Sequence, residues 1–245
     1  MISVDTLWSD QLKLDWNYSI YEPENLEREN MKLVYFLHGA GGNHTNFYEK
    51  TSLEKYLDAF NQKSDFSLAA IFVDGFNSYY VDKYMKVESA IFQDLIPGLE
   101  KRHSFNIGRE SRYLVGLSLG GWGALNYSFR HSDVFSKVFL LSPYLARNMR
   151  TDLEIRTWGI FEDDAEYKSH HPLTSFKENK DSMKPVEIYS YTGKHDKIAE
   201  AEDIKYLMDE IRDDVIVKDY YLDGEHEWGF WDKVLEKILL EDGEL

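Results

Sequence analysis

The chain has 245 residues, of which 43% are hydrophobic and 15% aromatic, so it is large and apolar enough to fold as a single domain over residues 1–245. Its 44 acidic and 28 basic residues give a formal charge of −16, which repels the phosphates of nucleic acids and anionic membrane surfaces. The chain has no cysteine, which excludes disulfides, thiolate catalysis and cysteine-based metal sites.

The N-terminal part predicts two strands, at residues 3–8 and 14–23, in which polar and apolar residues alternate as in an antiparallel edge. Residues 1–25 carry no basic region followed by an apolar one, and no stretch of the chain approaches the length of a membrane span. We therefore expect a cytoplasmic protein without a membrane partner.

The next strands are more continuously apolar, as is typical of strands buried on both faces of a parallel sheet. They are expected at residues 32–39, 68–75, 112–118, 137–143, 186–193 and 215–224. Helical patterns lie between them, for example from Ile198 to Ile211. This alternation predicts a doubly wound, mostly parallel α/β sheet with antiparallel N-terminal strands, in which ligands bind beyond the carboxyl ends of the strands.

A glycine-rich loop, "FLHGAGGNHTNF" at residues 36–47, follows the third predicted strand. Its glycines let the backbone approach a substrate carbonyl, and the backbone N–H of Ala40 is our candidate oxyanion donor. His38 in this loop is a rival for the role of general base, but a histidine in an H-G loop is more often a structural hydrogen-bonding residue.

The stretch "SRYLVGLSLGGWGAL", residues 111–125, places Ser118 where an apolar strand changes to a helical pattern. A nucleophile needs this context, because the sharp turn exposes its hydroxyl and the next helix directs backbone N–H groups toward it. A side chain at Gly116 or Gly120 would collide with neighbouring backbone. The backbone N–H of Leu119 is the second candidate oxyanion donor. The alternative is a glycine-rich turn in which Ser118 only caps the helix.

The segment from Tyr144 to Lys184 interrupts the alternation of strands and helices. It is polar with interspersed aromatic residues, and we expect it to be an insertion over the sheet. Whether it is a lid or an ordinary surface excursion stays open at this stage.

A catalytic serine needs a histidine to take its proton, and His226 has the best context for that role. It follows the last predicted strand in the stretch "YYLDGEHEWGFW", just before a helical pattern. The other histidines considered lie in polar connections: His170, His171 and His195.

The acid that orients this histidine has two candidates. Asp196 lies in the loop after the strand at 186–193, so the order along the chain is Ser, Asp, His, as expected of this architecture. Asp223 lies three residues before His226, where its simpler role is to shape the turn. We favour Asp196.

Together, the stretches "LHGAGGN", "GLSLGGWGAL", "TGKHD" and "GEHEWGFW" make the chain resemble the esterase D-like esterases of the α/β-hydrolase superfamily, over nearly its whole length. The resemblance implies an α/β-hydrolase fold and a serine carboxylesterase with Ser118, Asp196 and His226 as its triad. It implies no metal or organic cofactor, and it is compatible with a homo-oligomer. The missing cysteines and the missing signal peptide favour small acyl esters, short-chain or hydroxycinnamoyl, as substrates.

Two other functions stay open on the sequence alone. The same triad could transfer the acyl group to a sugar or glycerol hydroxyl, or the fold could be a non-catalytic module that binds a small ligand. Three tryptophans are candidate substrate contacts: Trp122, Trp158 and Trp228.

Overall fold

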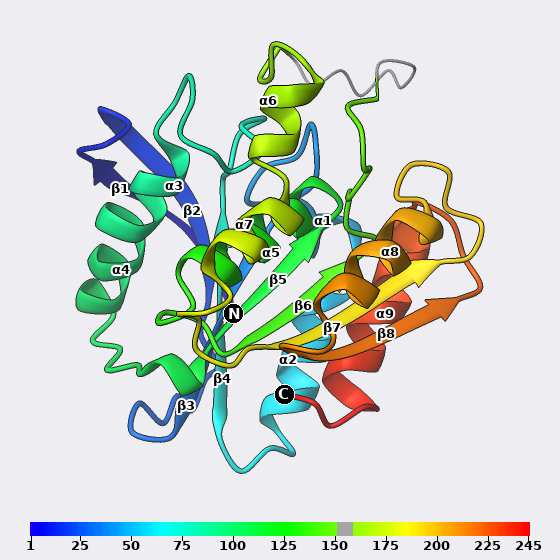
Figure 1. Ribbon diagram of the computed structural model, residues 1–245. Coiled ribbons are helices and arrows are strands. Elements are labelled where there is room, and N and C mark those ends of the chain that lie inside the picture. Colours follow the sequence, from blue (N-terminus) through cyan, green and yellow to red (C-terminus); the bar gives the residue numbers. More distant parts are fainter. Residues whose placement is uncertain (151–158) are drawn as a thin grey trace.

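The stretches predicted as strands form one sheet in the computed structural model, which describes residues 1–150 and 159–245 (Figure 1). Within these residues the sheet has eight strands in the order β1-β2-β4-β3-β5-β6-β7-β8. Their bounds are β1 Ile2–Ser9, β2 Leu14–Tyr21, β3 Met31–Leu37, β4 Ser67–Val73, β5 Arg112–Leu117, β6 Lys137–Leu141, β7 Glu187–Gly193 and β8 Ile216–Leu222. The strand predictions are therefore confirmed, with ends that differ by a few residues.

The pairing of the strands confirms the predicted fold class. Strand β1 pairs with β2, and β2 with β4, in antiparallel fashion, whereas every pair from β4 to β8 is parallel. In the sheet, β3 lies between β4 and β5, so the chain passes from β3 to its neighbour on one side and later returns to form its neighbour on the other side. In such sheets the crevice beyond the carboxyl ends of the strands, at this reversal of direction, is where ligands bind.

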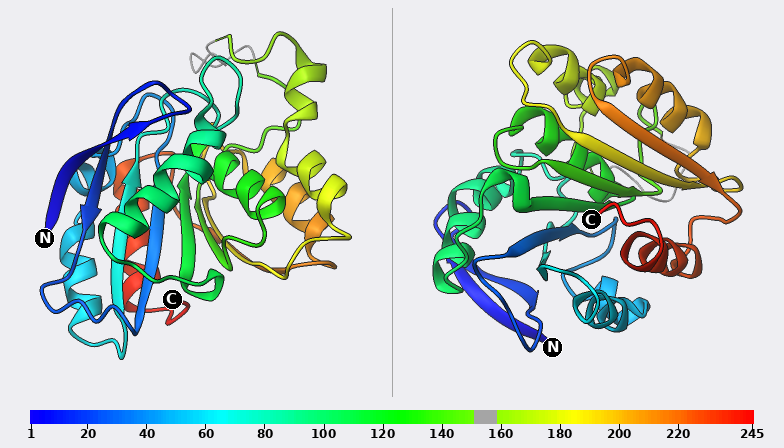
Figure 2. Two further views of the ribbon diagram at one scale, coloured as in Figure 1. Left: turned by 90° about the vertical axis from the view of Figure 1, so that its left-hand side faces the viewer. Right: turned by 90° about the horizontal axis from the view of Figure 1, so that it is seen from below.

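Helices cover both faces of the sheet. Their bounds are α1 Asn46–Lys50, α2 Leu53–Asn61, α3 Val87–Ala90, α4 Ile96–Arg102, α5 Leu119–Arg130, α6 Asp164–Ser169, α7 Pro172–Asn179, α8 Ala201–Ile211 and α9 Trp228–Leu240, with a π-helical turn at Ile91–Leu95 and a 3-10 turn at Arg109–Ser111. In Figure 2, α2 (cyan) and α9 (red) lie on one face, and the green, yellow and orange helices lie on the other. In the described part of the chain no helix combines the length and the apolar character that a membrane span requires.

The central strands are buried on both faces, which explains their continuous hydrophobicity. Strand β4 is buried at every position, and β3 at all but one. One apolar core lies between the sheet and the helices α3, α4, α5, α7 and α8, and a second lies between the sheet and α1, α2 and α9. For β8 the prediction of a strand buried on both faces was wrong: β8 lies at the edge of the sheet and has no fully buried residue, because this edge is open to solvent.

The segment from 144 to 184, apart from residues 151–158, contains α6 and α7 between β6 and β7. Helix α7 packs against α5 and α8 and thus belongs to the helix layer on that face. Helix α6 lies farther out, beyond the carboxyl ends of the strands (Figure 1). The aromatic residues Phe161 and Tyr167 of this segment are buried in a cluster with Tyr79 and Trp122. Its function as a lid stays a prediction.

Candidate active site

Ser118 lies in a sharp turn between the end of β5 and the start of α5. Its backbone has a positive φ of 53° with ψ −112°, a combination that costs a non-glycine residue about 1–3 kcal/mol. Three backbone hydrogen bonds hold this turn: Ser118 N–H donates to the carbonyl of Leu141, and its own carbonyl accepts from Gly121 and Tyr144, each at 2.9 Å. The surrounding structure therefore maintains a strained serine at the strand-to-helix junction.

The glycines beside Ser118 are required by close backbone contacts, as the sequence predicted. A Cβ atom on Gly120 would overlap the carbonyl oxygen of Leu37 at the end of β3, and one on Gly116 would overlap the backbone of Gly120. On the other side, a Cβ on Gly39 would come within 2.8 Å of the Leu117 side chain. The serine turn and the loop after β3 are thus in direct contact.

His226 connects Ser118 to Asp196 through two hydrogen bonds. Its Nε2 lies 3.0 Å from the Ser118 Oγ, and its Nδ1 lies 2.7 Å from Oδ2 of Asp196. The carboxylate can only accept, so Nδ1 carries a proton, and in the neutral imidazole Nε2 accepts the hydroxyl proton of Ser118. The structure therefore brings together the three side chains that the sequence predicted as a triad.

The Asp196 side chain is completely buried and held in one orientation. Its Oδ1 accepts hydrogen bonds from the backbone N–H groups of Ile198 and Ala199 at 2.9 and 2.8 Å, which leaves Oδ2 for His226. Two amide donors stabilise the ionised carboxylate in this buried position.

Asp223, the rival acid, does not contact His226 but pairs with His195, with 3.0 Å between Asp223 Oδ1 and His195 Nε2. Its side chain is 93% exposed, so this pair contributes little to stability. The loops that carry both residues are joined by backbone bonds, from Lys194 N–H to the Leu222 carbonyl and from His195 N–H to the Gly224 carbonyl. Asp223 therefore lies at the surface of the junction between the two loops.

His38 is a buried structural residue in the loop after β3. Its Nδ1 lies 2.7 Å from the carbonyl oxygen of Gly39, and the backbone N–H of Gly75 donates to its Nε2 at 2.9 Å. Since a carbonyl can only accept and an amide N–H can only donate, the proton is on Nδ1. Both ring nitrogens are occupied by backbone groups, which agrees with a structural role.

A cavity of about 140 Å³ opens beside Ser118. It is lined by Gly39, Ala40, Gly42, Asn46, Leu117, Ser118, His226, Trp228 and Trp231.

Of the three candidate tryptophans, Trp228 lines this cavity. The side chain of Trp122 is fully buried against Tyr79 and Tyr167 and lies outside the cavity lining. Trp158 lies outside the described residues.

Sequence reasoning missed Trp231 and Asn46, which line the same cavity. The Trp231 ring stands edge-on to the His226 imidazole, with 4.9 Å between ring centroids, and its Nε1–H donates to the Ser142 hydroxyl at 3.1 Å. A usable signal was its spacing of three residues from Trp228, which places both rings on one face of α9.

The remaining histidines near α6 and α7 lie away from Ser118. His171 caps α7, accepting a hydrogen bond from the backbone N–H of Leu173 at 3.1 Å, and its burial lowers its pKa to about 4. His170 lies at the end of α6, where its Nδ1 is 3.0 Å from the Glu166 carbonyl. Both have structural contacts that do not involve His226.

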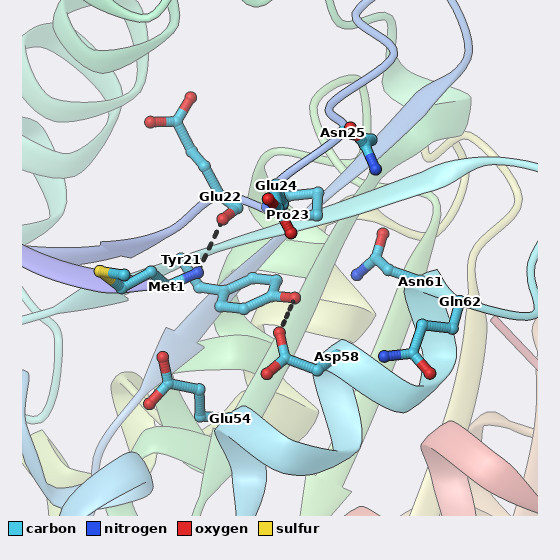
Figure 3. A pocket seen from close by; sticks show the side chains of 10 residues that line it. All are labelled: Met1, Tyr21, Glu22, Pro23, Glu24, Asn25, Glu54, Asp58, Asn61 and Gln62. Carbon is cyan, nitrogen blue, oxygen red and sulfur yellow. Dashed lines mark hydrogen bonds between the residues drawn. The ribbon is translucent and has the colours of Figure 1, made fainter.

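Figure 3 shows the lining of a larger cavity, of about 820 Å³. Asn61 and Asn25 of this lining are hydrogen-bonded to Leu68 and Ser67 at the start of β4, so the cavity lies at the amino edge of the parallel strands. Its lining is polar and acidic: Met1, Tyr21, Glu22, Pro23, Glu24, Asn25, Glu54, Asp58, Asn61 and Gln62. The Tyr21 hydroxyl donates to Asp58 at 2.7 Å. The lining of this cavity includes no histidine. Across residues 1–150 and 159–245, no group of three or more histidines and carboxylates is arranged to hold a metal ion. The smaller cavity at Ser118 is therefore the candidate active site.

Comparison with known proteins shows the family of the chain. The family model described as "Putative esterase" matches residues 9–241. An acetyl esterase of Caldicellulosiruptor saccharolyticus is 25% identical over 232 residues, which cover 86% of this chain and 83% of that protein.

Two solved structures share the fold. The substrate-bound fluorophosphonate-binding serine hydrolase F of Staphylococcus aureus superposes with a TM-score of 0.82 and 18% identity, covering 98% of this chain and 96% of that one. A ferulic acid esterase superposes with a TM-score of 0.80 and 21% identity, with the same coverage. At these identities the likeness concerns the fold.

Proposed function

The chain belongs to the esterase family whose model it matches, and from this membership we propose that it is a serine carboxylesterase that uses Ser118, His226 and Asp196 as its catalytic triad. The observation that carries the proposal is the continuous chain of hydrogen bonds from the Ser118 hydroxyl to the buried Asp196 carboxylate. It lies at the carboxyl edge of the sheet, beside a cavity, where ligands of this fold bind.

In the proposed acylation step, the Ser118 Oγ attacks the carbonyl carbon of the ester while its proton passes to Nε2 of His226. The electron pair of the carbonyl moves to its oxygen, and a tetrahedral oxyanion forms. When this intermediate collapses, the bond to the alcohol oxygen breaks, and the leaving alcohol takes the proton from His226. Asp196 stabilises the imidazolium that exists between these two transfers.

In the proposed deacylation step, water attacks the acyl-enzyme and gives one proton to His226. Collapse of the second tetrahedral intermediate releases the acid and returns the proton to the Ser118 oxygen. The backbone N–H groups of Ala40 and Leu119 are the proposed donors to the oxyanion. Ala40 lines the cavity beside Ser118, and Leu119 begins helix α5, whose N-terminal dipole favours negative charge at this position.

The size of the cavity favours a short acyl group. At about 140 Å³ it is smaller than the roughly 300–1,000 Å³ of pockets for drug-sized ligands, and about equal to a cavity of roughly 150 Å³ that holds benzene. An acetyl to butyryl group fits such a volume, whereas a hydroxycinnamoyl group exceeds it. We therefore propose esters of short acids as the substrates.

The test uses a fluorophosphonate probe and p-nitrophenyl acetate. The probe should label the wild-type protein and leave Ser118→Ala unlabelled, and kcat should fall by roughly 10⁶-fold in this variant, as for loss of the nucleophile in other serine hydrolases. Comparable ester hydrolysis by Ser118→Ala would refute the mechanism. Product analysis with added glycerol would reveal an acyltransferase, because the new ester would then predominate over the free acid.

A further inference from the structure

The loop that presents Ala40 is held by a second loop, distant in sequence, that follows β4. The backbone N–H of Gly41 donates to the side-chain Oδ1 of Asn77 at 2.7 Å, across 36 positions of sequence. Two further bonds join the same loops, from Gly75 N–H to the His38 ring and from the Tyr80 hydroxyl to the His38 carbonyl, both at 2.9 Å.

The loop that carries Asn77 has an unusual backbone. Phe76, Tyr79 and Tyr80 have φ values of 52°, 55° and 58°, in the left-handed region that non-glycine residues rarely adopt. Such a conformation persists only where surrounding contacts impose it. Here the Ser78 hydroxyl donates to the Gly75 carbonyl at 2.6 Å and accepts from Tyr80 N–H at 3.0 Å.

Tyr80 anchors this loop to the rest of the fold. It is fully buried, its ring packs where a Cβ on Gly75 or on Gly123 of α5 would stand, and its carbonyl accepts a hydrogen bond from the Tyr127 hydroxyl at 2.7 Å. Asn77 therefore projects from a loop that is fixed to the helix following Ser118.

These contacts determine the two peptide planes on either side of the Ala40 Cα. The peptide between Gly39 and Ala40 is trans, so its N–H points away from its carbonyl. That carbonyl is held by the His38 Nδ1–H at 2.7 Å and by Gly42 N–H at 3.1 Å. The next peptide is held through its Gly41 N–H by Asn77. Gly41 has φ 69°, and glycine adopts positive and negative φ about equally readily, so Gly41 itself does not resist rotation of this peptide.

We propose that Asn77 is a positioning residue for ester hydrolysis: by accepting the Gly41 N–H, it fixes the backbone after Ala40 so that the Ala40 N–H is directed at the oxyanion. The proposal rests on the function proposed above, because it needs Ser118 as the nucleophile and Ala40 as a donor. Asn77 acts through the backbone and does not line the cavity. Its effect therefore belongs to the transition state and not to substrate binding.

The test compares Asn77→Ala with Asn43→Ala as a matched control. Asn43 is an exposed asparagine of the same glycine-rich loop, and its Oδ1 accepts from the backbone and hydroxyl of Thr45, away from Ala40. For Asn77→Ala we expect kcat on p-nitrophenyl acetate to fall about 10- to 100-fold, less than the loss of a whole oxyanion donor. KM should stay within about threefold, because ground-state binding is unchanged. Asn43→Ala should match the wild type in both constants.

A second measurement uses the fluorophosphonate probe, which phosphonylates Ser118 with loss of fluoride and also develops negative charge on an oxygen in this site. The rate of labelling should fall in Asn77→Ala in parallel with kcat. Thermal unfolding checks that each variant is folded. If Asn77→Ala does not fold, the test is repeated with Asn77→Leu, because leucine has a shape similar to that of asparagine and no hydrogen-bond acceptor.

The outcomes separate the two proposals. Equal kcat and labelling rates in Asn77→Ala and Asn43→Ala would overturn the role of Asn77 and leave the triad intact. A rise in KM at constant kcat would also overturn it, because Asn77 would then contribute to substrate binding. A wild-type protein that neither reacts with the probe nor hydrolyses esters would overturn the proposed function, and the role of Asn77 with it.

Discussion

The two walls on either side of Ser118 are constructed differently. The proposed acid-base wall, residues 193–199 and 222–228, presents side chains that form the Asp196–His226 pair. The proposed oxyanion wall, residues 37–42 and 74–80, consists of backbone that is held by side chains behind it: His38 Nδ1–H donates to the Gly39 carbonyl, and Asn77 Oδ1 accepts from the Gly41 N–H. Side chains that can react are recognised from residue types in the sequence, whereas the orientation of backbone groups is recognised only from the fold.

The largest expected effect tests the acid-base wall. If Asp196 is the acid, Asp196→Asn should misorient His226 and fail to stabilise its charged form, lowering kcat by about 10⁴-fold, as the same change does in serine proteases. Asp223→Asn is the control and should change kcat little, since Asp223 is exposed and pairs with His195. The measurement is kcat on one ester at saturating concentration. The reverse ranking of the two variants would assign the acid role to Asp223.

The next effect concerns the aromatic cluster behind the oxyanion wall. Tyr79 of this wall packs against Trp122, and the ring of Trp122 contacts His171. Burial lowers the pKa of His171 to about 4, from about 6.5 in the unfolded chain. Between these values the unfolded state binds more protons, so His171 destabilises the fold as the pH falls from 6.5 to 4 and has no such effect above about pH 7. The loss in the free energy of unfolding is at most about 3 kcal/mol.

His171→Asn should remove this pH dependence, because asparagine can still cap α7 and does not titrate. Urea unfolding at pH 7.5 and pH 4.5 should show a smaller loss of stability for His171→Asn than for the wild type. His170→Asn, at the neighbouring position, is the control. Identical losses in the wild type and His171→Asn would mean that His171 is not the group responsible.

The smallest expected effect concerns the size of the acyl group. Trp228 lines the cavity from the acid-base wall, and Trp228→Ala should enlarge it. The ratio of kcat/KM for p-nitrophenyl hexanoate to that for the butyrate should rise about tenfold, since each buried methylene contributes about 0.8 kcal/mol. Trp8→Ala, at an exposed tryptophan of β1, should leave the ratio unchanged. An unchanged ratio in Trp228→Ala would mean that this ring does not limit the acyl group.

Much of the fold and of the acid-base wall could be predicted from the sequence for identifiable reasons. Strands such as β4 are buried on both faces, so their apolar runs are nearly unbroken. Ser118 directly follows β5, and Asp196 and His226 lie in the loops after β7 and β8. Parallel strands end at one edge of the sheet, so residue type and chain order were sufficient to predict that the three side chains meet.

Two residues were not placed correctly from the sequence, Trp122 and Asn77, and both depend on contacts between distant parts of the chain. Trp122 was a candidate substrate contact, but it lies on the side of α5 that faces the aromatic cluster, where its ring is fully buried. Asn77 carried no sequence signal, because its partner is a backbone amide 36 positions away and any residue can supply an amide. Contacts of this kind depend on how loops from different strands meet.

The amino edge of the parallel strands lies opposite Ser118 and takes no part in the proposed chemistry. The turn between α2 and β4, at Lys63 to Asp65, lies at the amino edge, far from Ser118 along the strands (Figure 1). Exposed turns tolerate attachment and insertion better than regular elements do. For use as an immobilised catalyst, coupling to a solid support through Lys63 would leave the cavity at Ser118 facing the solution, so that ester could reach it and acid and alcohol could leave.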